Sequence, residues 1–324
     1  MPEFSTDVHL LIQVITGGRP KLAERPTSRF LKELSRIGTV EWCIREDHIL
    51  GYERDAFPFN PYPVEFANEY ARTHWRHSES RWEPGGFFGA FPGREWACLS
   101  AEERGYDAVL QLDDNVRDLG LVNAHLPAYR DGAGPADLLS ALAELSASSN
   151  VAMLGAQLNS APPSPRAKVL RTGYPYSVFI EKVGPSRLPY YGPFEDDIMH
   201  ALDYALPETP ITAGVVDAIR YVKDSKSRTG MRSHYNPLRG LEISRRYPRN
   251  VRLQLGPRTS SPVDQTRGVR HYLNTSGFTP VRILDRERYG RAVSYLSDRL
   301  TAGREAYRGQ TFRKLERRAG GALQ

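Results

Sequence analysis

The sequence predicts an α/β protein in which helices flank a mixed, mostly parallel sheet and a basic extension follows at the C-terminus. Two apolar runs, at residues 8–15 and 38–44, read as strands. A glycine-containing turn at 16–20 and a helix from about residue 28 to 37 lie between them. This strand, helix, strand order predicts a parallel sheet with right-handed crossovers.

The alternation continues along the chain. Helices are expected at 95–104, 137–147 and 193–204, and strands at 106–112, 151–158, 176–181 and 211–221. Residues 51–93 are rich in proline, glycine and aromatic residues, which is typical of a long binding loop or lid. We expect a core over residues 1–236, a basic subregion packed on it over 237–300, and a basic tail, helical or frayed, over 301–324.

Composition narrows the class of protein. With 324 residues, 40% of them hydrophobic, the chain can bury one large core or two modest ones. It has no apolar run near the roughly 20 residues that span a bilayer, and its first residues lack the pattern of a signal peptide. A cytoplasmic protein with no membrane partner is expected. Cys43 and Cys98 have apolar flanks and are expected to be reduced, packed residues.

The net charge of +6 conceals a strong asymmetry. Residues 1–216 carry 20 Lys and Arg against 29 Asp and Glu, whereas residues 217–324 carry 24 against 9, a net charge of +15. A basic, arginine-rich surface attracts polyanions through phosphate contacts and counterion release. Nucleic acid is therefore the expected partner, and the alternative is a solvated basic surface that balances an acidic one.

A carboxylate cluster directly follows the apolar strand at 106–112. Asp113, Asp114 and Asn115 stand where a buried parallel strand would open into a ligand crevice. Mg²⁺ and Mn²⁺ prefer oxygen ligands, commonly one or two carboxylates together with the phosphates of a nucleotide. The cluster indicates a cation site, and the alternative is that it only caps the next turn.

Two other segments carry groups suited to a phosphorylated ligand. Thr16, Gly17 and Arg19 follow the first strand, where glycine permits close backbone approach and arginine offers a hydrogen-bonding fork; an ordinary tight turn is the alternative. Residues 223–236 form a loop dense in donors. No dinucleotide-binding or P-loop glycine pattern follows a strand, which disfavours dehydrogenases of the Rossmann type and P-loop enzymes.

Three acids, Glu195, Asp196 and Asp197, open the helix that is expected after residue 193. The helix dipole favours acids at that position, which is their structural explanation. A carboxylate there can also take a proton from an alcohol. A metal shared by Asp196 and His200, four residues apart, is a weaker alternative because no third ligand is near in the sequence.

The motif order resembles the GT-A class of nucleotide-sugar glycosyltransferases: a strand followed by Thr-x-x-Arg-Pro, a helix, a strand ending in Leu-Asp-Asp-Asn, and a later Phe-Glu-Asp-Asp. The stretch at 223–232, together with the basic end, looks like the TET-associated glycosyltransferases of bacteriophages. That group is associated with adding sugars to hydroxymethylated pyrimidines in DNA. The resemblance implies a metal-dependent transferase with a nucleoside-diphosphate sugar as donor.

The resemblance also implies roles on the donor side. Asp113 would contact the nucleoside, and Asp114 and Asn115 would lie at a Mn²⁺ or Mg²⁺ ion. His234 would be a further metal ligand, and the alternative is a plain hydrogen-bonding loop residue. The base pocket would be lined by residues of the first turn, Thr16, Gly17 and Arg19. The departing diphosphate would be neutralised by four cations, Lys223, Lys226, Arg228 and Arg232.

On the acceptor side, the resemblance makes Asp196 the candidate general base toward the acceptor hydroxyl, with Glu195 as the fallback. The expected acceptor is a 5-hydroxymethylpyrimidine in DNA. One alternative is a glycosyltransferase acting on a protein or cell-surface glycan. A second, from another class, is a non-catalytic DNA-binding protein on an α/β scaffold.

Overall fold

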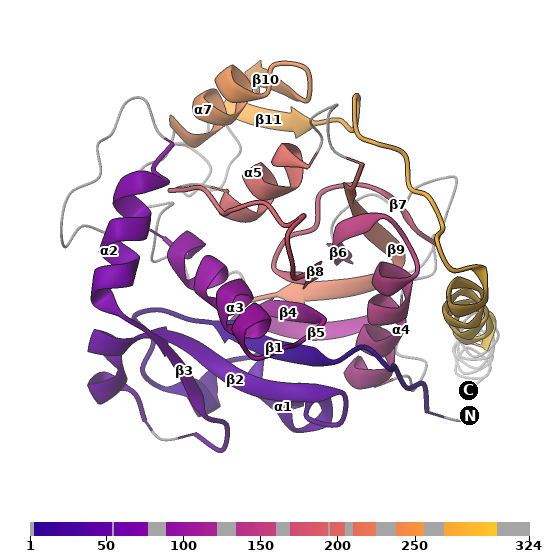
Figure 1. Cartoon of the computed structure of the whole chain (residues 1–324), viewed down its shortest axis with the longest axis horizontal. Coiled ribbons are helices and arrows are strands. Elements are labelled where there is room, and N and C mark those ends of the chain that lie inside the picture. The colour runs from indigo at the N-terminus through magenta and orange to yellow at the C-terminus, as the bar shows by residue number, and fades with distance from the viewer. Residues whose placement is uncertain are drawn as a thin grey trace, which may run out of the picture.

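The computed structural model describes residues 3–53, 55–76, 89–121, 134–159, 169–193, 195–204, 210–224, 238–255 and 269–302. Its centre is a large mixed sheet (Figure 1). The strands of this sheet are β1 (Leu10–Ile15), β2 (Gly38–Arg45), β3 (Phe59–Tyr62), β4 (Ala108–Asp113), β5 (Val116–Leu121), β6 (Val151–Leu158), β7 (Arg171–Thr172), β8 (Val178–Lys182) and β9 (Thr212–Lys223). They pair in the order β3-β2-β1-β4-β8-β6-β9-β5, with β7 on β9.

Helices and short elements surround the sheet. The helices are α1 (Ser28–Leu34), α2 (Val64–Thr73), α3 (Phe91–Glu103), α4 (Pro135–Ala147), α5 (Asp196–Asp203), α7 (Leu238–Arg246) and a helix that includes residues 286–302, with 3-10 turns η1 (Leu22–Glu24) and η2 (Glu46–Gly51). A separate antiparallel pair consists of β10 (Val251–Leu255) and β11 (Val269–Leu273). Among the described helices, none has the length and apolar character needed to cross a bilayer.

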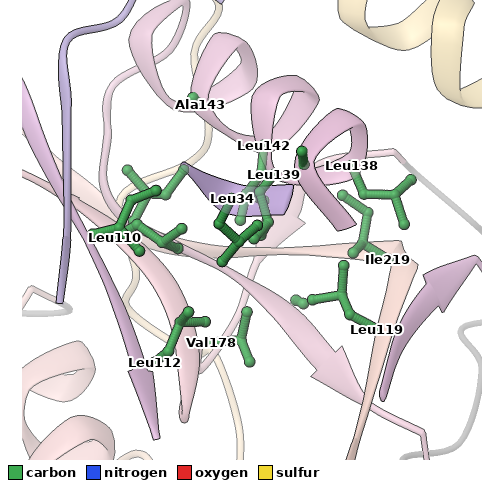
Figure 2. Packing of buried hydrophobic residues seen from close by; sticks show 14 of the residues in the cluster. Leu34, Leu110, Leu112, Leu119, Leu138, Leu139, Leu142, Ala143, Val178 and Ile219 are labelled. Atoms are coloured by element: carbon green, nitrogen blue, oxygen red, sulfur yellow. The ribbon is translucent and has the colours of Figure 1, made fainter. Parts of the chain in front are cut away.

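The two faces of the sheet carry separate hydrophobic clusters because side chains alternate along each strand. On β1, Leu10 and Ile12 belong to the cluster that includes α1 and α4, whereas Leu11 belongs to the cluster that includes α3 and α5. Figure 2 shows the first cluster, in which Leu110 and Leu112 of β4 lie beneath leucines of α4. Both faces are covered, so the central strands β1 and β4 are mostly apolar and are buried along almost their whole length.

A topological switch point lies between β1 and β4. These strands are parallel neighbours, with Ile15 in register with Asp113. The chain leaves β1 through α1 on one face of the sheet and reaches β4 through α3 on the other. In open α/β sheets, such a reversal leaves a crevice outside the carboxyl ends of the two strands, where ligands bind.

Most predicted elements are confirmed, although β3, α2 and β5 were missed, as were β7, α7, β10 and β11. Residues 51–93 are not a continuous loop, because β3 and α2 lie within them. As an edge strand, β3 accommodates Pro61 without breaking a central ladder. β5 begins directly after Asn115 and pairs antiparallel with β9. Its sequence mixes polar and apolar residues without a clear period, so the strand could not be predicted locally. Pairing with β9, which is distant in the sequence, stabilises it.

The basic subregion contacts the core at two places. Tyr247, just after α7, donates a 2.7 Å hydrogen bond to Asp203 of α5. Arg288, in the helix that includes residues 286–302, donates a 2.7 Å bond to the buried Glu144 of α4. This helix begins at residue 286, ahead of the tail that was expected from residue 301. Residues 303–324 lie outside the described residues. Cys43 and Cys98 are buried and free, as expected.

Candidate functional site

The candidate site lies at the carboxyl edge of the large sheet. β1, β4 and β9 all end at this edge, and the antiparallel β8 begins there. The amino ends of α3 and α5 contribute Arg94 and Asp196, which form an ion pair. Residues from six elements therefore lie at this edge of the sheet, although they are far apart in sequence.

Asp113, the last residue of β4, is held by two cations. Arg94 Nη2 lies 2.8 Å from Oδ1, and Lys223 Nζ, at the end of β9, lies 2.7 Å from Oδ2. Burial opposes ionisation, but the charges of Lys223 and Arg94 outweigh it and hold the pKa of Asp113 below its ordinary value. Asp113 is therefore a fixed carboxylate at the sheet edge.

Ser177, immediately before β8, supports this arrangement. Its hydroxyl accepts a 2.8 Å hydrogen bond from Lys223 Nζ, and its carbonyl accepts a 2.9 Å bond from the Asp113 N–H group. Ser177 has a φ of 65°, which is unfavourable for a residue other than glycine. A strained, buried serine thus positions the two charged groups, an arrangement often found at functional sites.

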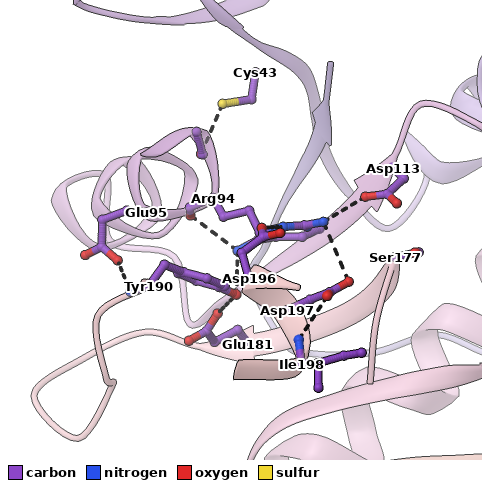
Figure 3. Close-up of polar contacts among 12 residues, drawn as sticks. Cys43, Arg94, Glu95, Asp113, Ser177, Glu181, Tyr190, Asp196, Asp197 and Ile198 are labelled. Carbon is purple, nitrogen blue, oxygen red and sulfur yellow. Dashed lines mark hydrogen bonds and ion pairs between the residues drawn. The ribbon is translucent and has the colours of Figure 1, made fainter. Parts of the chain in front are cut away.

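Arg94 connects the end of β4 with the start of α5. Its Nε donates a 2.6 Å bond to Asp196 Oδ2, and its Nη2 lies 3.9 Å from Asp197 Oδ2 (Figure 3). The guanidinium is almost fully buried, and the Asp196 and Asp113 charges outweigh this burial and hold its pKa well above the ordinary value. Arg94 therefore fixes the two predicted functional carboxylates relative to each other.

Asp114, one residue beyond β4, joins the ends of β4 and β1. Thr16, after β1, donates a 2.8 Å hydrogen bond to Asp114 Oδ2. Arg25 Nε lies 3.1 Å from the same oxygen, and Arg19 forms a close ion pair with Oδ1. Asp114 is buried, so this carboxylate organises the turn that was predicted to line the base pocket. Among the described residues, no side chain or backbone atom lies within 4 Å of the Cβ position of Gly17, which leaves the backbone open toward them.

Thr27 attaches the start of α1 to the β4–β5 turn. Its hydroxyl accepts a 3.0 Å hydrogen bond from the N–H group of Val116 and donates a 2.7 Å bond to the Asp113 carbonyl. The side chain is fully buried, so both turn groups have a partner away from water. In the turn that Thr27 holds, Asp113 faces Arg94 and Lys223, whereas Asp114 faces Arg19 and Arg25.

The acids of α5 sit in two different environments. Asp196 is ion-paired with Arg94, whereas Asp197 Oδ1 accepts a 2.9 Å bond from the Ile198 N–H group. Burial, and next the charge of Asp196, raise the pKa of Asp197 to about 7. Glu195, at the N-cap, has a φ of 46° in the left-handed region.

We predict that Asp197→Asn raises the melting temperature at pH 8 by a few degrees and has little effect at pH 4. The folded chain binds the Asp197 proton more tightly than the unfolded chain, so the free energy of unfolding falls as pH rises from about 4 to about 7. The amide removes the buried charge that is present above that window. Thermal unfolding followed by circular dichroism at both pH values is the measurement. Equal shifts at pH 4 and pH 8 would contradict the prediction.

A buried polar network lies beneath the site. His200 Nε2 is 2.5 Å from Glu181 Oε1, and Tyr190 donates a 2.5 Å hydrogen bond to Glu181 Oε2. Gln111 of β4 links Tyr190 to Arg94. His200 is fully buried and paired with Glu181, and Asp196 is paired with Arg94, so these contacts do not favour the weaker alternative of a metal shared by Asp196 and His200.

Several predicted residues have no described position. Lys226, Arg228, Arg232 and His234 lie outside the described residues. Conversely, Arg94 and Arg25 were missed. Arg94 lies three residues after Phe91 and four before Cys98, on the apolar stripe of α3. The predicted helix began at residue 95, so this position was not assigned to the stripe. A charged residue on such a stripe requires a buried partner.

The structure describes two of the three predicted metal ligands, Asn115 and Asp114, and they differ in how well they fit a divalent cation. Asn115 Oδ1 is buried without a hydrogen-bond partner, as a ligand oxygen can be. Asp114 does not fit as it stands, because both of its oxygens already contact cationic side chains. Among the described residues, no three His, Cys, Asp or Glu side chains form a metal-binding group; His234 lies outside them.

A cavity of about 370 Å³ lies elsewhere, at the opposite edge of the sheet. It is lined by Val8, Asp107 and Lys182, among others. Its cations already have structural partners, because Lys182 donates to the Ser149 carbonyl and Arg288 pairs with Glu144. We therefore place the functional site at the carboxyl edge, where charged groups from several elements meet.

The fold and site define an α/β protein with a large mixed sheet and a charged cluster at its switch point. Comparison with protein-family models, curated proteins and solved structures finds no match. The functional argument therefore depends on the geometry of this chain.

Proposed function

We propose that the chain is a GT-A glycosyltransferase that moves a sugar from a nucleoside-diphosphate sugar to a 5-hydroxymethylpyrimidine in DNA. The supporting observation is the convergence of Thr16, Asp113, Lys223 and Asp196 at one edge of the sheet. These residues follow or precede four different elements and flank a switch point, where α/β proteins bind nucleotides.

On the donor side, the nucleoside lies against Asp113 and the turn formed by Thr16, Gly17 and Arg19. Lys223 contacts the Asp113 carboxylate, and Arg19 and Arg25 contact the Asp114 carboxylate beside this turn. Their charges stabilise the negative charge that develops on the departing diphosphate. Of the predicted diphosphate-binding residues, Lys226, Arg228 and Arg232 remain sequence-based proposals.

On the acceptor side, Asp196 removes the proton of the hydroxyl as its oxygen bonds to the anomeric carbon. The bond from that carbon to the diphosphate breaks in the same displacement. Arg94 positions the Asp196 carboxylate through their 2.6 Å bond. The expected metal ligands are Asp114, Asn115 and His234, but no step is assigned to the ion because the contacts of Asp114 do not fit one.

The DNA acceptor is favoured by the charge of the C-terminal region. Arg246, Arg249 and Arg252 are exposed on the α7–β10 unit, which contacts the carboxyl end of α5 through Tyr247. α5 has eight residues, a length of about 12 Å, and Asp196 lies at its other end. Arginines at this distance can bind the phosphates of a duplex, whose modified base must be flipped out for the reaction.

The proposal predicts that one sugar nucleotide raises the melting temperature and donates its sugar to DNA containing 5-hydroxymethylcytosine. Ligand binding to the folded state alone stabilises it by mass action. The measurements are a thermal-shift screen of UDP-, GDP-, ADP-, CDP- and TDP-sugars, followed by mass spectrometry of digested DNA. Duplexes with unmodified cytosine are the control.

Each rival function gives a different result in this experiment. Donor binding without transfer to DNA, but with transfer to a glycoprotein, would support the glycan-directed transferase. DNA binding without binding of any sugar nucleotide would support the non-catalytic DNA-binding protein and overturn the proposal.

A further inference from the structure

We infer that Arg19, Arg25 and Lys223 themselves hold the diphosphate of the donor, without a divalent cation. This inference rests on the proposed function and concerns the same site. The ligand class is a nucleoside diphosphate, and the protein supplies the charge that a metal ion would otherwise provide.

The first observation is the occupation of Asp114. Mg²⁺ binds carboxylate oxygens at about 2.0–2.1 Å, yet Oδ2 already has Thr16 Oγ1 at 2.8 Å and Arg25 Nε at 3.1 Å. The other oxygen, Oδ1, is ion-paired with Arg19. A cation bound to Asp114 would displace at least one guanidinium and would meet repulsion from the other.

The second observation is that Asp113 is occupied in the same way. One oxygen pairs with Arg94 and the other with Lys223. All four carboxylate oxygens of Asp113 and Asp114 therefore have a cationic partner. Arg94 also pairs with Asp196, so its charge is shared. The other three cations, Arg19, Arg25 and Lys223, still exceed the carboxylates of Asp113 and Asp114 by one charge, which favours an anionic ligand and disfavours an additional cation.

Exposure separates the cations that can reach a ligand from the one that cannot. The side chains of Arg19, Arg25 and Lys223 are 24%, 17% and 28% exposed, whereas that of Arg94 is 4% exposed. A guanidinium has five N–H donors in a planar fork that matches phosphate. Asp114 holds two such forks in place before the ligand arrives, which lowers the entropy cost of binding.

The test is calorimetric titration of UDP, GDP, ADP, CDP and TDP into the full chain, in excess EDTA and in saturating Mn²⁺ or Mg²⁺. We expect the preferred nucleoside diphosphate to bind in EDTA with a Kd within about threefold of its value with metal. Arg19→Gln should weaken that binding by about tenfold or more. The affinity for the parent nucleoside, which has no phosphate, should fall by less, because the backbone of the turn remains.

Arg288→Gln is the matched control. Arg288 is 25% exposed and pairs with Glu144, a carboxylate that is 2% exposed, but it lies at the opposite edge of the sheet. This variant should bind the nucleoside diphosphate like the original chain. The titrations in EDTA and in metal use the unaltered chain. They therefore test whether binding needs a metal even if a variant fails to fold.

Three results count against the inference, and they differ in what they say about function. Binding that requires Mn²⁺ or Mg²⁺ overturns the arginine assignment and leaves the glycosyltransferase proposal in place. No binding of any nucleoside diphosphate in either condition overturns both. The nucleoside diphosphate could also bind without metal and bind equally well to the Arg19→Gln variant. That result would overturn the role of Arg19 and its turn in holding the diphosphate.

Discussion

Asp196→Asn is expected to lower the rate of sugar transfer by about 10²-fold or more, the usual scale of general acid–base catalysis. An amide cannot take the proton of the acceptor hydroxyl, but it can still accept a hydrogen bond from Arg94, which is now 2.6 Å from Asp196 Oδ2. The Kd for the nucleoside diphosphate should therefore stay within about threefold. Initial rates at saturating donor, together with calorimetry, separate the two effects.

Asp203→Asn is the control for this substitution. Asp203 lies in the same helix, is buried where Asp196 is half-buried, and pairs with Arg76 and Tyr247 away from the carboxyl edge. It should cost stability without a comparable loss of turnover. Near-normal transfer by Asp196→Asn would move the base to Glu195 or indicate a retaining mechanism, and Glu195→Gln distinguishes these outcomes.

Arg94→Met is expected to lower the free energy of unfolding by about 3–5 kcal/mol, because removing one partner of a buried ion pair leaves uncompensated charge. Asp113 would keep only Lys223, and Asp196 would lose its one described ion pair. Urea denaturation near pH 7 measures the loss. The loss should shrink at low pH, since protonation of the carboxylates removes the stranded charges.

Arg104→Met is the matched control for the loss of an arginine near the same helix. Arg104 follows α3 and pairs with Glu41, but its side chain is 38% exposed. Pairs this accessible to water contribute about 0–1 kcal/mol. If Arg94→Met lowers the free energy of unfolding by no more than Arg104→Met does, water must solvate the carboxylates of the site once Arg94 is removed.

The strands that carry the site could be predicted from local patterns. A mostly apolar run ending in Asp113 indicates a strand buried on both faces, and β4 is that strand. The polar residues after β1 and β4 could be assigned to one edge, because the carboxyl ends of adjacent parallel strands coincide. β3, α2 and β5 escaped prediction, since proline, aromatic and mixed polar sequences do not show a clear period.

The site itself was predictable only in part. Asp113, Asp196 and Lys223 were chosen from their sequence context, and Arg94 brings the two aspartates together through a single buried guanidinium. Arg94 lies 19 residues from Asp113 and 102 from Asp196. No local pattern encodes pairing over such separations.

The sequence alone determined the α/β class, the central strands and the acids at their ends, because these depend on hydrophobic period and residue type. Only the tertiary structure decided how those acids are used. It places Asp114 among arginines and Asp196 on Arg94, and it leaves Asp197 in a buried setting with a raised pKa. The physical reason is that the state of a carboxylate depends on burial and on the charges within a few ångströms, and both follow from chain segments that meet only when the sheet is assembled.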